Sequence, residues 1–396
     1  MIYSDFNGIK LSRLGFGCMR FAMDPTTGTI DQEKVNAMFD LAIANGVNYF
    51  DTAYPYLGGN SEIAVAEALR KYPRDSYYLA DKFPGHSLPG PVDNIALFNV
   101  SLRKCETDYF DFYLLHNVNE NSLSCYYGNP DNHFIEYFLE QKAKGRIRHL
   151  GFSCHAAPAG LEQFLALYGK DVEFCQIQLN YVDWTLQNAK KKCEILKAAG
   201  LPVWVMEPVR GGRLAHFDAA IEEAMRAFRP DESIPAWAFR WLRTVPQPTM
   251  ILSGMSNLQQ MQDNLKTFEE HRPLNQEELA LLGRVASQIA QLIPCTGCRY
   301  CCAGCPMELD IPTMLSMAND MAVAKSFNTV ARYSALGEGK RADSCIGCGQ
   351  CMAACPQKIH VPEELKKLDA LMSSQKSWEE ICQERAAAAE AMKKKG

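Results

Sequence analysis

Eight short apolar runs, each separated from the next by an amphipathic stretch, restrict the fold of this chain more than any other feature of its sequence. The runs are LGFG (14–17), NYFDTA (48–53), YYLADK (77–82), DFYLLH (111–116), HLGFSC (149–154), FCQIQL (174–179), PVWVME (202–207) and TMILSG (249–254). Apolar runs of this length are typical of strands that are buried on both faces, as in parallel sheets covered by helices.

The stretches between the runs have helical periodicity. In DQEKVNAMFDLAIANG (31–46), for example, apolar residues recur at helical spacing; Thr29 and Gln32 predict a capping box at the start, and Gly46 predicts the end. Eight strands that alternate with helices predict an α/β fold, a (β/α)8 TIM barrel. The alternative, an open doubly wound sheet, requires a GxGxxG turn after its first strand, and GFGCMR does not match it.

Two further signals concern the chain before the first run and after the last. Asn7-Gly8, between IYSDF and IKLSR, favours a two-residue type I′ turn and predicts a β-hairpin. LNQEELALLGRVASQIAQLI (274–293) predicts one more amphipathic helix, followed by a break at Pro294. We therefore expect a barrel domain over residues 1–290 and a second domain over residues 291–396.

Polar side chains stand at the ends of three consecutive runs. Asp51, Lys82 and His116 follow the second, third and fourth runs, and Tyr56 lies in the loop after Asp51. Because barrel enzymes react at the carboxyl ends of their strands, we expect these side chains to converge. Such a set suits carbonyl reduction: hydride leaves negative charge on oxygen, so a tyrosine must donate a proton there. A neighbouring ammonium lowers the tyrosine pKa, a carboxylate holds the ammonium, and a histidine orients the oxygen.

The stretch DTAYPYLGGNSE (51–62) resembles the Asp-Thr-Ala-x-x-Tyr-Gly signature of the aldo-keto reductases. The resemblance implies that the hairpin plugs the barrel, that Tyr56 is the proton donor, that Lys82 and Asp51 tune it, and that His116 orients the substrate. Tyr54 is the competing tyrosine, but it lies two residues too early for the pattern. The implied activity is NAD(P)H-dependent reduction of an aldehyde or ketone.

The same resemblance implies a nicotinamide cofactor, NADP or NAD, at the barrel mouth. GFSCH, CQIQLNY, MEPVRGGRLA and SGMSNLQQMQDNL resemble the segments that bind it. The residues implied are Ser153, Gln176, Tyr181, Pro208, Val209, Gly211, Gly212, Gly254, Ser256, Gln260, Asp263 and Asn264. Gln178 competes with Gln176, because both lie on one face of a strand. NADPH-selective members carry Lys and Arg where this chain has Gly254 and Gln260, so the choice of coenzyme stays open.

Nine of the 16 cysteines fall into two bunches. CTGCRYCCAGCP (295–306) and CIGCGQCMAACP (345–356) share C-x2-C-x2-C-x3-C-P, and Cys302 lies outside the shared pattern because it aligns with Met352. In such motifs three cysteines ligate one [4Fe-4S] cluster and the fourth ligates the other. This assigns Cys295, Cys298, Cys301 and Cys355 to one cluster, and Cys345, Cys348, Cys351 and Cys305 to the other.

The alternative, two four-thiolate zinc sites, usually has two CxxC pairs for each ion. The region therefore resembles bacterial two-cluster ferredoxins, with a helical insert between the motifs. This predicts a small, mainly α-helical iron–sulfur domain.

The composition narrows the choice of partners. A net charge of −5 gives no reason to expect nucleic acid, and neither a signal peptide nor an apolar stretch long enough to span a membrane is evident. We expect a cytoplasmic enzyme with a small carbonyl substrate. The two clusters predict electron transfer or docking with a redox partner protein. The alternative is a non-catalytic, nicotinamide-binding barrel that acts as a redox-sensing or electron-transfer subunit.

Overall fold

The computed structural model describes residues 1–24, 27–84, 94–118, 126, 133–290, 292–295, 299–323, 327–334, 336–355, 359–376 and 380. The chain divides into two compact units, one of residues 1–215 with 225–281 and the other of residues 216–224 with 282–396. The expected domain boundary after residue 290 stays a prediction. In the described part of the chain, no helix has both the length and the apolar character needed to cross a membrane.

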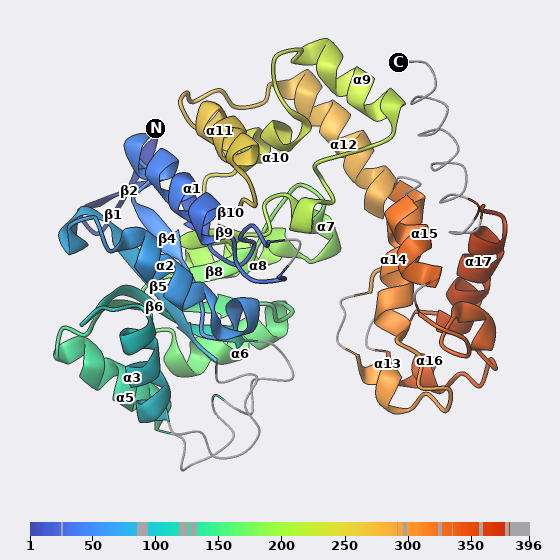
Figure 1. Ribbon diagram of the computed structural model, residues 1–396, viewed down its shortest axis with the longest axis horizontal. Helices are drawn as coiled ribbons and strands as arrows, with labels where there is room; N and C mark the ends of the chain where they lie inside the picture. Colours follow the sequence, from blue (N-terminus) through green and yellow to red (C-terminus); the bar gives the residue numbers. More distant parts are fainter. Residues whose placement is uncertain are drawn as a thin grey trace. The chain divides into compact units, whose positions relative to one another are not determined.

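The first unit contains a closed barrel of eight parallel strands (Figure 1). The strands follow one another around the barrel in chain order, and the last pairs with the first. They are β3 (Leu14–Gly17), β4 (Tyr49–Asp51), β5 (Tyr78–Phe83), β6 (Phe110–Val118), β7 (Ile147–Cys154), β8 (Cys175–Gln178), β9 (Val203–Met206) and β10 (Pro248–Gly254). Each overlaps one of the eight apolar runs, so the predicted TIM barrel is confirmed.

Helices connect successive strands of the barrel. They are α1 (Gln32–Ala44), α2 (Ser61–Leu69), α3 (Asn94–Lys104), α5 (Phe134–Ala143), α6 (Pro158–Tyr168), α7 (Asp183–Leu186), α8 (Ala189–Ala198), α9 (Ala219–Phe228), α10 (Ile234–Leu242) and α11 (Leu258–Thr267). The capping box predicted for α1 is wrong. Asp31 caps this helix instead of Thr29, because its carboxylate accepts a hydrogen bond from the Lys34 amide at 3.2 Å.

The N-terminal hairpin closes one end of the barrel interior, as predicted. Its strands are β1 (Tyr3–Phe6) and β2 (Ile9–Ser12), and the φ angles of 51° at Asn7 and 83° at Gly8 suit the expected type I′ turn. Phe6 packs edge-on against Trp204 inside the barrel, with ring centroids 5.0 Å apart.

The second unit is helical and repeats its own structure. Its helices are α13 (Tyr300–Ala303), α14 (Ile311–Val323), α15 (Phe327–Ser334), α16 (Gln350–Ala354) and α17 (Val361–Ser373), preceded by α12 (Gln276–Ala290). The helices α13 and α16 touch, and α14 packs on α17. Arg299 and Gly349, the residues before α13 and α16, occupy equivalent positions in the repeat and both have positive φ, 65° and 76°. The duplicated cysteine motif is therefore also a duplicated backbone structure.

Candidate functional site

The strands of the barrel bring one layer of polar side chains to its carboxyl end. Tyr49, Ala80, Leu114, Phe174 and Trp204 belong to the apolar cluster inside the barrel. Because side chains alternate along a strand, the residues two positions further on face the same interior. These residues are Asp51, Lys82, His116, Gln176 and Met206.

Asp51 and Lys82 form a buried ion pair in this layer. The Lys82 side chain is 1% exposed, and its Nζ contacts Asp51 Oδ1 and donates to the Thr52 carbonyl at 2.8 Å. Burial raises the pKa of Asp51, while Lys82 opposes this shift. For Lys82, burial lowers the pKa, but the Asp51 carboxylate and the hydrogen-bonding phenol of Tyr56 outweigh it and raise the pKa above its usual range. Lys82 is therefore a fixed positive charge.

Tyr56 lies directly beside this charge. It begins a short 3₁₀ helix, η1 (Tyr56–Gly59), in which Leu57 and Gly58 have positive φ and turn the chain sharply. Lys82 Nζ lies 4.9 Å from the centroid of the Tyr56 ring, and the His116 ring meets it edge-on at 5.6 Å between centroids. The structure thus brings all four expected side chains together.

The expected acidity of this phenol differs from what the structure supports. Burial raises the pKa of Tyr56, and although Lys82 lowers it, burial has the larger effect. A neighbouring ammonium alone predicts a lowered pKa, but enclosing a phenolate in the folded protein has a cost that raises it. Without a bound ligand, Tyr56 is therefore protonated at neutral pH.

The competing tyrosine, Tyr54, lies beside a different ion pair. Tyr54 has the Lys104 ammonium 4.7 Å from its ring centroid, and Lys104 pairs with the buried carboxylate of Glu62. Tyr54 and Tyr56 thus have similar cationic neighbours but only Tyr56 adjoins Lys82 and His116.

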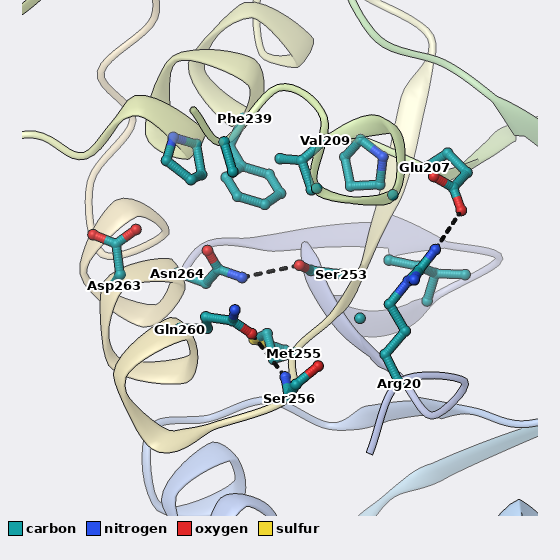
Figure 2. A pocket seen from close by; sticks show the side chains of 17 residues that line it. Arg20, Glu207, Val209, Phe239, Ser253, Met255, Ser256, Gln260, Asp263 and Asn264 are labelled. Carbon is teal, nitrogen blue, oxygen red and sulfur yellow. Dashed lines mark hydrogen bonds and ion pairs between the residues drawn. The ribbon is translucent and has the colours of Figure 1, made fainter. Parts of the chain in front are cut away.

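A cavity of about 250 Å³, open to solvent, lies at the ends of β9 and β10 (Figure 2). It is lined by nine of the residues expected to bind the cofactor: Pro208, Val209, Gly211, Gly212, Gly254, Ser256, Gln260, Asp263 and Asn264. The φ angles of 67° at Gly211 and 94° at Gly212 need glycine, and they leave one wall of the cavity as bare backbone.

Three expected cofactor residues do not line this cavity. Ser153 is buried, and its hydroxyl accepts a hydrogen bond from the Asn117 amide at 2.7 Å. Gln176 is also buried, near Asp51. Burial raises the pKa of Asp51, and a hydrogen bond from Gln176 opposes this rise. Tyr181 is buried with its ring 6.4 Å from that of Trp241. The roles of these three residues stay predictions.

The competitor of Gln176 already has a partner. Gln178 donates to Asp183 at 2.7 Å, and Arg210 contacts the same buried carboxylate at 3.3 Å. Asn180 donates both to Asp183 and to the Glu207 carbonyl, at 2.7 and 3.0 Å. This network holds in place the start of the loop that contains Gly211 and Gly212.

Sequence reasoning missed several residues of the cavity, above all Arg20 and Glu207, which pair at 3.4 Å on one side of it. Arg20 follows β3 by three residues, so the rule that places functional residues at strand ends could have found it. Phe239 and Met255 contribute apolar surface that carries no recognisable sequence signal.

In the second unit, a cavity brings together the four cysteines predicted to share one cluster. Cys305, Cys345, Cys348 and Cys351 all line it, although Cys305 comes from the other motif. Its remaining lining is largely apolar and includes Leu309. Four thiols from both motifs around one apolar cavity are a donor set that fits an iron–sulfur cluster. Within the described ranges, no three Cys, His or acidic side chains lie close enough together to hold a single metal ion.

The other predicted set is described only in part. Cys298 lies outside the described residues. Burial raises the pKa of the Cys301 thiol to about 12, and the neighbouring thiols of Cys302 and Cys295 add to the shift. Cys355 packs against the same apolar core as these residues. Cys302 is the additional thiol that the repeat leaves out.

Comparison with known proteins gives both units a counterpart. Residues 13–286 match the aldo/keto reductase family, and residues 294–360 match a 4Fe-4S dicluster domain. A probable aldo-keto reductase 1 from Glycine max is 22% identical over 213 residues, which cover 52% of this chain and 58% of that protein.

Two further matches extend over most of the barrel. The oxidoreductase YqkF from Bacillus subtilis is 24% identical over 310 residues, which cover 69% of this chain and 92% of that protein. An aldo/keto reductase from Klebsiella pneumoniae, solved in complex with NADP and acetate, has a TM-score of 0.57 at 21% identity. That match covers 70% of this chain and 92% of the other, and it shows a shared fold.

Proposed function

Because the chain belongs to the aldo/keto reductase family, we propose that it reduces a small aldehyde or ketone with NADH or NADPH at the mouth of its barrel. One observation carries this proposal: Tyr56 lies between the ammonium of Lys82 and the ring of His116, with Asp51 behind the ammonium. Such a set can protonate an oxygen that receives charge.

Each of these residues has a distinct task in the proposed reaction. Tyr56, which burial keeps protonated, donates its proton to the substrate oxygen. Lys82 then stabilises the phenolate that remains, and Asp51 keeps Lys82 charged and in position. His116 faces the edge of the Tyr56 ring, where its imidazole orients the substrate oxygen.

The cavity at β9 and β10 supports the nicotinamide coenzyme, which supplies hydride when bound. The bare backbone at Gly211 and Gly212 lets a pyrophosphate approach closely. Ser256, Gln260 and Asn264 offer polar contacts along the opposite wall (Figure 2). These residues fit a dinucleotide bound in an extended conformation.

The 4Fe-4S dicluster domain adds two [4Fe-4S] clusters to this barrel. We propose the ligand sets Cys295, Cys298, Cys301, Cys355 and Cys305, Cys345, Cys348, Cys351, of which the second is supported by the shared cavity. We further propose that the clusters exchange electrons with a redox partner protein, because two adjacent clusters exceed what is needed to stabilise a small domain.

The test of the proposed function compares two tyrosine variants of the anaerobically purified full chain. Tyr56→Phe removes the proposed proton donor, so NAD(P)H oxidation with a panel of aldehydes and ketones should fall by about 10²- to 10⁴-fold. Tyr54→Phe is the matched control, because this ring also lies beside a lysine ammonium, and it should retain most of the activity. Equal activity of wild type and Tyr56→Phe would overturn the role of Tyr56 as proton donor, and no NAD(P)H oxidation by either protein would favour a non-catalytic, redox-sensing barrel.

A further inference from the structure

The charges around the coenzyme cavity show which coenzyme it accepts. Among its described lining residues, the charged side chains are Arg20, Glu207 and Asp263, one cation against two carboxylates. NADPH differs from NADH by one phosphate on the adenosine ribose, which carries close to two negative charges at neutral pH. We propose that this site selects NADH and rejects NADPH, an inference that rests on the proposed function.

Arg20, the cation among the described lining residues, is already paired. Arg20 contacts Glu207 at 3.4 Å, so the carboxylate offsets part of the charge that could attract an added phosphate. Figure 2 shows this pair on one side of the cavity and Asp263 on the other. A phosphate near Asp263 would meet a carboxylate, which is unfavourable because like charges repel.

The start of α11, the helix that carries Asp263, is also unsuited to a phosphate. Helix N-termini usually bind anions through free backbone amides. Here the Gln260 backbone amide donates to the Asn257 side chain at 2.9 Å. The Ser256 backbone amide donates to the Gln260 side chain at 2.8 Å (Figure 2). Two amides that could hold a phosphate are therefore occupied by the chain itself.

The same groups suit an unphosphorylated ribose. The Asp263 carboxylate accepts a hydrogen bond from Ser233 at 2.5 Å and can accept more from ribose hydroxyls. Asn264 donates to Ser253 at 2.9 Å and lines the same wall. Carboxylate and amide groups bind a neutral diol well, whereas a carboxylate repels a phosphate.

The test measures binding, so it does not depend on finding the substrate. NADH and NADPH are titrated separately into the anaerobically purified full chain, and quenching of tryptophan fluorescence gives each Kd. We expect NADH to bind at least about tenfold more tightly than NADPH.

Two arginine variants then locate the selectivity. Gln260→Arg places a cation in the cavity, which should raise the affinity ratio of NADPH to NADH about five- to thirtyfold. Gln259→Arg adds the same charge to the same helix outside the cavity lining, and it should change the ratio less than about twofold.

The outcomes separate this inference from the proposed function. NADPH binding as tightly as NADH would overturn the inference while leaving the reductase proposal intact. Equal effects of Gln259→Arg and Gln260→Arg would overturn it as well. Binding of neither coenzyme would overturn the proposed function together with the inference.

Discussion

The ion pair between Asp51 and Lys82 should couple the stability of the barrel to its proposed chemistry. Both side chains are almost completely buried, and Lys82 also donates to the Thr52 carbonyl. A charge enclosed in this way depends on its partner, because water cannot reach it to compensate. Replacing either residue alone therefore leaves an uncompensated charge inside the barrel.

The expected magnitudes follow from this burial. Lys82→Met isolates the Asp51 carboxylate and should lower the free energy of unfolding by about 3–5 kcal/mol. The lost hydrogen bond to Thr52 adds about 1 kcal/mol. Asp51→Asn isolates the ammonium and should cost about 3–5 kcal/mol as well. The double variant removes both charges, so it should be more stable than the sum predicts, with a coupling energy of about 3 kcal/mol.

The assay is urea unfolding followed by tryptophan fluorescence under anaerobic conditions. Four of the five tryptophans, including Trp204 in the barrel interior, belong to the first unit, so the signal reports mainly on the barrel. A coupling energy below about 0.5 kcal/mol would refute the reasoning, because it would mean that solvent screens the pair as it does at a protein surface.

Three other perturbations have expected outcomes. Burial raises the pKa of Glu173, but hydrogen bonds from His149 and Lys142 outweigh this effect and lower the pKa to about 2. The stability that this carboxylate contributes above pH 4.5 should therefore be lost as the pH falls towards 2. Glu173→Gln should remove this loss, worth at most about 3 kcal/mol, from acid unfolding curves. Cys305→Ser should reduce iron from about eight to about four atoms per chain, whereas Cys302→Ser should leave it unchanged in iron and sulfide assays. Gly151→Ala places a Cβ 2.5 Å from a buried phenylalanine ring of the barrel and should cost about 1–3 kcal/mol in the same urea assay.

The sequence predicts the barrel well because its strands are buried on both faces. Such strands leave continuous apolar runs, and the polar residue that ends a run marks the working end of the strand. Asp51, Lys82 and His116 could be recognised for this reason. The hairpin could be predicted equally well from the sequence, because Asn7-Gly8 favours one turn type.

Other features depend on packing that a linear sequence does not show. The pKa of Tyr56 rises because neighbouring segments enclose the phenol, an effect that outweighs the nearby ammonium. Tyr181 packs near Trp241 on α10, 60 positions later in the chain. Arg20 follows β3 and Glu207 follows β9, so only the closure of the barrel brings this pair together.

The duplicated second unit has a consequence for its assembly. Cys305 of the first motif lines a cavity with three cysteines of the second motif, so neither motif alone provides four thiols for a cluster in the proposed ligand sets. Contacts between α13 and α16, and between α14 and α17, join the two halves of the repeat. Each cluster should therefore hold the two halves of the repeat together, because three of its proposed ligands come from one half and the fourth comes from the other.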